Sequence, residues 1–127
     1  MQDRVVFEYA FIRFVPRVER GEFLNVGVIL FCKRKDYLDV KIHLDEPRIL
    51  AFAKDTDLED LKRYLRSWEL IAHGKPEGGS LAQMDTPSRF RWLTAARSTI
   101  IQNSKVHTGL CSSPTKMLEK LMEQYIF

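Results

Sequence analysis

The chain has 127 residues, of which 45% are hydrophobic and 29% charged, and its formal net charge is +3. This length predicts one domain over residues 1–127 with a core that needs neither disulfides nor metals, and the composition excludes a mainly disordered chain. The positive charge is spread along the sequence, so it permits an acidic partner without indicating a dedicated nucleic-acid binder.

The first third of the chain predicts three strands. Residues 5–15 and 23–32 are apolar on both faces, which is typical of central strands that are covered on each side. Their short connection holds Pro16 and Gly21, so the two strands should be antiparallel neighbours. Residues 37–44 alternate between apolar and polar side chains, which predicts a third strand with one wetter face.

Helical spacing dominates the next part of the chain. A short helix is expected over residues 47–52, where Pro47 suits the first turn. Thr56 and Glu59 match a capping box, in which each side chain bonds the other residue's free amide. Apolar residues then recur every three or four positions as far as Ile71, which predicts an amphipathic helix.

The rest of the chain predicts two more helices around a fourth strand. One helix starts at Asp85-Thr86-Pro87, residues 97–102 form a short strand with a polar loop after it, and Ser113-Pro114 opens the last helix. The predicted order is β-β-β-α-α-α-β-α. We therefore expect the α+β class, with an antiparallel sheet of about four strands packed with helices.

Targeting and cofactor signals are weak in this sequence. The first residues lead directly into a strand that contains Glu8, unlike a signal peptide, and no apolar run approaches the roughly 20 residues of a membrane span. Cys32 and Cys111 have neither zinc spacing nor the pattern of a disulfide framework. No phosphate-binding loop is recognisable. We expect a cytoplasmic protein with no membrane segment, no metal and no cofactor.

A dense polar cluster separates the first two predicted strands. Arg13 lies in an apolar strand, where a guanidinium needs a carboxylate partner to offset its desolvation. Glu19 or Glu22 would supply that partner. The cluster is then a structural ion pair that fixes the hairpin, or a site where Arg13 and Arg20 contact an anion or nucleotide. Its members are Arg13, Glu19, Arg20, Glu22 and Asn25.

A second polar cluster follows the third helix and includes Arg97, Ser98, Gln102 and His107. His107 is a satisfied loop histidine or a general base, and we expect Ser104 or nearby backbone to bond it, with no deep pocket beside it. Because buried polar groups must satisfy one another, we expect both clusters on one side of the sheet.

These residues resemble a known family. Tyr9 to Pro16, Glu19 to Glu22 and Asn25 to Ile29 are similar to the opening motif of the bacterial domain-of-unknown-function family numbered 3037, and Arg97 to Gln102 with Val106 to Leu110 resemble its second motif. The resemblance covers nearly the whole chain and implies a small intracellular bacterial protein. It also implies a Hip-type kinase, in a toxin–antitoxin-like system, as a partner. Carried over by residue, it selects Arg13, Glu19, Arg20, Glu22, Asn25, Gly27, Arg97, Ser98, Gln102 and His107.

Three functions remain open from the sequence. The first is a binding or regulatory module that acts on a partner protein, which is favoured because nucleophile, metal and cofactor motifs are missing. The second is an enzyme for a phosphate-containing or nucleotide substrate, with Arg13, Arg20, Arg97 and His107 around one cleft. The third, a nucleic-acid binder, is possible but less favoured.

Overall fold

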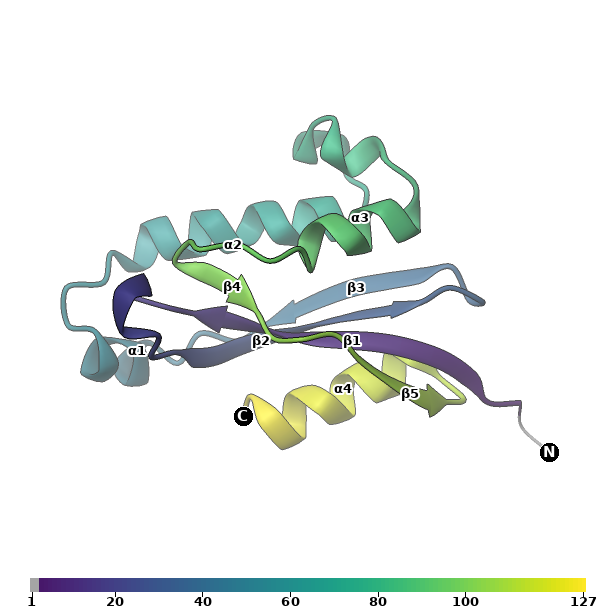
Figure 1. Ribbon diagram of the computed structural model, residues 1–127, viewed down its shortest axis with the longest axis horizontal. Helices are drawn as coiled ribbons and strands as arrows, with labels where there is room; N and C mark the ends of the chain where they lie inside the picture. Colours follow the sequence, from purple (N-terminus) through teal and green to yellow (C-terminus); the bar gives the residue numbers. More distant parts are fainter. Residues whose placement is uncertain (1–2) are drawn as a thin grey trace.

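The computed structural model describes residues 3–127 as a sheet with helices on both faces (Figure 1). The strands are β1 (Val5–Phe14), β2 (Leu24–Cys32), β3 (Tyr37–Ile42), β4 (Ile101–Asn103) and β5 (His107–Cys111). The α-helices are α1 (Glu46–Phe52), α2 (Leu58–Ala72), α3 (Thr86–Leu93) and α4 (Pro114–Tyr125), and short 3-10 turns are η1 (Val18–Arg20), η2 (Pro76–Gly78) and η3 (Leu81–Gln83). Among these described residues, no helix has the length and apolar character needed to cross a bilayer.

The β1–β2 hairpin is the centre of the sheet. The two strands pair antiparallel from Glu8 opposite Phe31 to the end of the hairpin, and the register shifts by one residue between Ile12 and Arg13. This bulge leaves Val26 as the extra residue of β2. Beside it, a Cβ on Gly27 would lie 2.4 Å from the carbonyl oxygen of Lys41, so the close approach of β3 requires glycine.

Two short strands, β4 and β5, pair with the other edge of β1. β4 pairs with residues 12–14 and β5 with residues 5–9, both antiparallel. Ser104 bridges the gap between them: its amide donates to the carbonyl of Phe11 at 2.9 Å, and its hydroxyl oxygen accepts from the Phe11 amide at 2.8 Å. Ser104 therefore continues the ladder and is buried for a structural reason.

Helices α1, α2 and α3 cover one face of the sheet. Their buried side chains pack with one set of strand residues into the larger core cluster. The cluster contains Ile12, Phe14, Val26, Ile29, Phe31, Val40, Ile49, Leu61, Leu65, Trp68, Ile71, Ala72, Phe90, Leu93 and Ile101.

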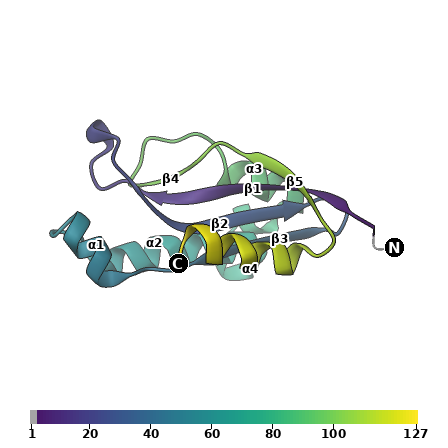
Figure 2. The same cartoon turned by 90° about the horizontal axis from the view of Figure 1, so that it is seen from below.

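Helix α4 covers the opposite face, but only in part. Figure 2 shows it lying over β2 and β3, with β1, β4 and β5 beside it rather than beneath it. Its Leu118, Leu121 and Met122 join a smaller core cluster with alternate residues of β1 and β2. Further along β1, the side chains on this face are only partly buried: Tyr9, Phe11 and Arg13.

The predicted α+β class and the first three strands are confirmed, with three corrections. The strand predicted over residues 97–102 is shorter and shifted, since β4 spans only Ile101–Asn103. The sheet has five strands rather than four, because residues 107–111 form β5 where a polar loop was expected. The capping box is wrong: Asp57 caps α2 by accepting from the Asp60 amide at 3.1 Å. The Thr56 hydroxyl instead donates to the carbonyl of Ala53 at 2.6 Å.

Candidate functional site

Three of the residues singled out in the sequence form one row across the sheet. Arg13 of β1 lies opposite Asn25 of β2 on one side and Gln102 of β4 on the other. Residues that oppose each other in an antiparallel ladder point to the same face. Ile101 and Phe14, their neighbours in sequence, belong to the larger core cluster on the other face. The row therefore points to the face that α4 covers only in part.

Arg13 has a different partner from the one predicted. Within residues 3–127 no carboxylate lies within salt-bridge distance of its guanidinium. Its guanidinium carbon lies 4.0 Å from the ring centroid of Phe23, which is a cation–π contact. Its Nε is buried and has no hydrogen-bond partner.

The predicted ion pair of Arg13 with Glu19 or Glu22 is therefore wrong, for a local reason. Arg20 lies two residues from Glu22, and its Nε donates to that carboxylate at 2.6 Å. This exposed contact raises the pKa of Arg20, first through the hydrogen bond and then through the charge of Glu22. Glu19 is exposed in η1.

An aromatic strip continues the row along β1. Tyr9 and Phe11 follow on the same face, with ring centroids 5.8 Å apart, and both are only partly buried. His107, opposite Tyr9 in the β1–β5 ladder, has its ring 5.2 Å from that of Tyr9. Tyr125 at the end of α4 lies edge-on to Phe11 at 5.3 Å and is 55% exposed. We call this surface the open face: Tyr9, Phe11, Arg13, Phe23, Asn25, Gln102, His107 and Tyr125.

His107 is an exposed residue of β5 whose ring is tilted against those of Tyr9 and Phe11, rather than a hydrogen-bonded loop residue. The expected bond to Ser104 is absent from the described structure, because both the amide and the hydroxyl of Ser104 are used in the sheet. Next to it, Gly109 gives room to the ring of Phe7, which lies 2.8 Å from where a glycine Cβ would stand. His107 can therefore act as part of a contact surface.

Arg97 lies on the other face of the sheet, away from the open face. Its guanidinium packs between Trp68 and Trp92, at 4.9 and 4.8 Å from the ring centroids, and donates to the carbonyl of Trp92. Burial lowers the pKa of this guanidinium. Ser98 is exposed on the segment before β4. The second cluster is thus divided: Gln102 and His107 reach the open face, whereas Arg97 is a packing residue under α2 and α3.

With this geometry established, comparison with known proteins gives one match. The family described as "Protein of unknown function (DUF3037)" matches residues 9–126. The chain belongs to this family. No curated protein and no solved structure matches it. The matched span of this DUF3037 chain contains all eight residues of the open face.

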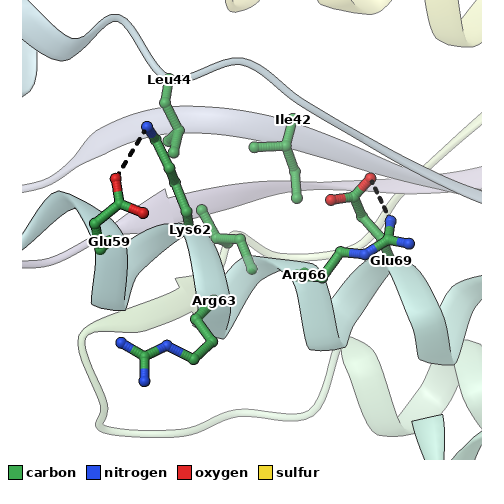
Figure 3. A pocket seen from close by; sticks show the side chains of 8 residues that line it. Ile42, Leu44, Glu59, Lys62, Arg63, Arg66 and Glu69 are labelled. Atoms are coloured by element: carbon green, nitrogen blue, oxygen red, sulfur yellow. Dashed lines mark ion pairs between the residues drawn. The ribbon is translucent and has the colours of Figure 1, made fainter. Parts of the chain in front are cut away.

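Two hollows lie elsewhere on the surface. One, of about 750 Å³, separates the β1–β2 connection from the α1–α2 connection and holds Arg20 and Glu22 at its rim. The other, of about 650 Å³, lies between α2 and the edge of β3 above Ile42 and Leu44 (Figure 3).

The charges around the second hollow are paired with one another. Lys62 lies 3.1 Å from Glu46 and 3.5 Å from Glu59, and Arg66 lies 3.8 Å from Glu69. This mutual pairing leaves little charge to recognise a ligand. Within residues 3–127, no three His, Cys, Asp or Glu side chains converge as metal ligands would.

The sequence did not single out the aromatic members of the open face. Tyr9 and Phe11 alternate with apolar residues of the other face, so they fit a strand that is covered on both sides. Nothing in that pattern shows that α4 lies mainly over β2 and leaves Tyr9 and Phe11 of β1 only partly covered. A weak signal was the polar Arg13 in register with these rings, since a charged residue is unusual on a fully buried strand face.

Proposed function

We propose that this chain is a binding or regulatory module that docks a partner protein on its open face. The observation that supports this most is the aromatic strip of β1, whose Tyr9 and Phe11 lie at the edge of α4 and are only partly buried. Tyrosine and arginine are enriched among the residues that contribute most binding energy at protein interfaces, and phenylalanine is enriched at interfaces in general. The open face combines these residue types.

The enzyme hypothesis has less support. A phosphate-processing site would need Arg13, Arg97 and His107 around one cleft. The sheet separates them, because Arg97 packs between two tryptophans under α2 and α3 while Arg13 and His107 point to the open face. Each arginine packs against aromatic rings. Because Arg97 lies on a different face from Arg13 and His107, the three side chains cannot contact one substrate together.

A nucleic-acid interface is the second candidate, since rings on a sheet also stack on unpaired bases. Such sites follow the phosphate backbone with many cations. The in-register residues of the open face include one arginine, Arg13, beside the amides Asn25 and Gln102. A protein partner therefore fits this balance of aromatic and polar groups better.

The partner class that we favour is a kinase-like protein of the toxin–antitoxin type, as the family resemblance implies. We place the interaction in the cytoplasm. Cys32 and Cys111 are both buried free thiols, which suits a reducing compartment.

The test is co-purification from native lysate with two matched double variants. Phe11→Ser with Tyr125→Ser alters the open face, while Val6→Ser with Leu110→Ser alters exposed apolar residues on the opposite face of β1 and β5. We expect mass spectrometry to find a protein that the wild type and the Val6/Leu110 variant retain and the Phe11/Tyr125 variant loses. Equal capture by all three chains, or recovery of nucleic acid by ultraviolet absorbance instead, would contradict the proposal.

A further inference from the structure

The guanidinium of Arg13 is held in place without an acceptor. Phe23 stacks against it at 4.0 Å, and its Nε is buried with no partner. A buried N–H on a charged group loses its hydration, which adds to the cost of holding the guanidinium there. Arg13 is only partly buried, and no carboxylate pairs with it among the described residues, so an anionic group of another molecule can reach the accessible part of the guanidinium.

Asn25 lies next to Arg13 in the same row and adds a second donor. Its Oδ1 is buried, whereas its side-chain NH2 is not among the buried atoms, so the NH2 group is the part of the amide that a ligand can reach. On the other side, the side-chain amide nitrogen of Gln102 donates to the carbonyl of Thr99 at 2.9 Å, so that group is already used. A carboxylate accepts from a guanidinium and from a side-chain amide alike, so an acidic side chain suits both Arg13 and Asn25.

The aromatic strip indicates what should flank the anion. Phe11 lies two residues before Arg13 on the same strand face, a step of roughly 6.6 Å, and Tyr125 stands edge-on to it at 5.3 Å. An extended peptide advances by the same distance over two residues. Its side chains at positions i and i+2 would therefore match Arg13 and Phe11.

We propose that Arg13 and Asn25 form a seat for an acidic residue in an extended segment of the partner, whose apolar residue two positions away rests on Phe11 and Tyr125. The proposal depends on the proposed protein-binding function and specifies its ligand. The charges are complementary, because the seat presents an unpaired cation and the segment brings a carboxylate. A guanidinium stacked on one face still presents its edge for a bidentate contact with a carboxylate.

The experiment is selection of random displayed dodecapeptides on three chains: wild type, Arg13→Gln and Arg34→Gln. Arg34 is exposed in the turn between β2 and β3 and serves as the matched control. We expect the wild type and the Arg34 variant to enrich peptides with Asp or Glu two positions from an apolar residue. The Arg13→Gln chain should lose that enrichment. Arg13→Lys keeps the positive charge but loses the paired N–H donors of the guanidinium. It should therefore bind the selected peptides with intermediate affinity.

The selected peptides then provide the quantitative test. Changing their acidic residue to its amide should weaken binding to the wild type by about tenfold or more, as expected for a hydrogen-bonded charge. Selection without acidic enrichment, or equal binding of acid and amide forms, would reject the seat. Displacement of the peptides by adenosine monophosphate but not by acetate would also reject it, in favour of a nucleotide site.

Failure of the seat is distinguishable from failure of the proposed function. Peptides that lack the acidic pattern but lose binding in the Phe11/Tyr125 double variant would keep the docking face and remove Arg13 from it. Equal binding to that variant, or selection of no peptide by the wild type, would reject the docking face and the seat together. Melting curves of Arg13→Gln and Arg13→Lys show whether each variant is folded when it is tested.

Discussion

The two faces of the sheet treat arginine and aromatic residues in opposite ways. Beside α2 and α3, Arg97 is half-buried between Trp68, which is 1% exposed and part of the main core, and Trp92, which is 36% exposed. On the open face, Arg13 stacks on a ring that is 41% exposed, and Tyr125 is 55% exposed. The contact between an arginine and an aromatic ring is thus structural next to α2 and α3. On the open face the same kind of contact is available for binding.

The largest expected difference between the faces concerns their aromatic residues. Trp68→Ala should lower the free energy of unfolding by about 3–5 kcal/mol, because it leaves a large cavity in the main core. Tyr125→Ala should lower it by less than about 1 kcal/mol, since an exposed side chain loses little burial. Urea unfolding monitored by circular dichroism measures both. Similar losses for the two variants would mean that the open face is a packed core surface.

The second prediction concerns Gly27, next to the β2 bulge that turns Asn25 to the open face beside Arg13. Gly27→Ala should destabilise the fold by about 2–3 kcal/mol, because its Cβ would overlap backbone at Lys41 and β3 would have to move. Gly21→Ala provides a comparison, since nothing lies within 4 Å of its Cβ and only its positive φ of 71° opposes the change. A neutral Gly27→Ala in the same unfolding experiment would contradict the tight packing of β2 against β3.

The third prediction compares the two arginines directly. Arg97→Met should lower stability by about 1–2 kcal/mol, because it removes two cation–π contacts and a hydrogen bond to backbone. Arg13→Met should leave stability unchanged or raise it slightly, because the lost stacking is offset by removal of a buried N–H without a partner. A loss of about 3 kcal/mol at Arg13 would restore the ion-pair interpretation that the sequence suggested.

The smallest expected effect concerns the cap of α3, remote from the open face. Asp85 accepts from the Ser88 amide at 2.9 Å, and hydrogen bonds from Ser88 lower its pKa. A lowered pKa in the folded state stabilises the protein above the ordinary aspartate pKa, and this contribution is lost as the pH falls through the lowered value. The melting temperature of Asp85→Asn should therefore lie slightly below that of the wild type at pH 7. The difference should disappear once the pH has fallen below the lowered pKa of Asp85. A gap that persists there would show that charge is not involved.

Much of the fold could be predicted because local sequence patterns indicate its strands and helices. Apolar runs on both faces gave β1 and β2, alternation gave β3, and three-and-four spacing gave α2. The strand β5 was not predicted, because it is short, contains Gly109 and has mostly exposed side chains. It is a strand only because β1, about a hundred residues earlier, offers it an edge.

The candidate site was harder to predict than the fold. Sequence motifs drew attention to Arg13, Asn25, Gln102 and His107, which the strand registers bring onto one face. Their grouping with Arg97 failed, because the segment that contains Arg97 has no regular strand alternation. Its sequence therefore does not show which face of the sheet Arg97 occupies. The extent of the open face depends on where α4 packs against the sheet. The sequence of a single strand does not show this tertiary packing.

Photo-crosslinking in living cells tests the central claim most directly. The crosslinking amino acid p-benzoylphenylalanine would replace Tyr125 on the open face or Leu110 on the opposite face, two positions that are 55% and 56% exposed. We predict a crosslinked partner protein from position 125 and none from position 110. Crosslinking from position 110 alone, or equally from both positions, would contradict docking on the open face.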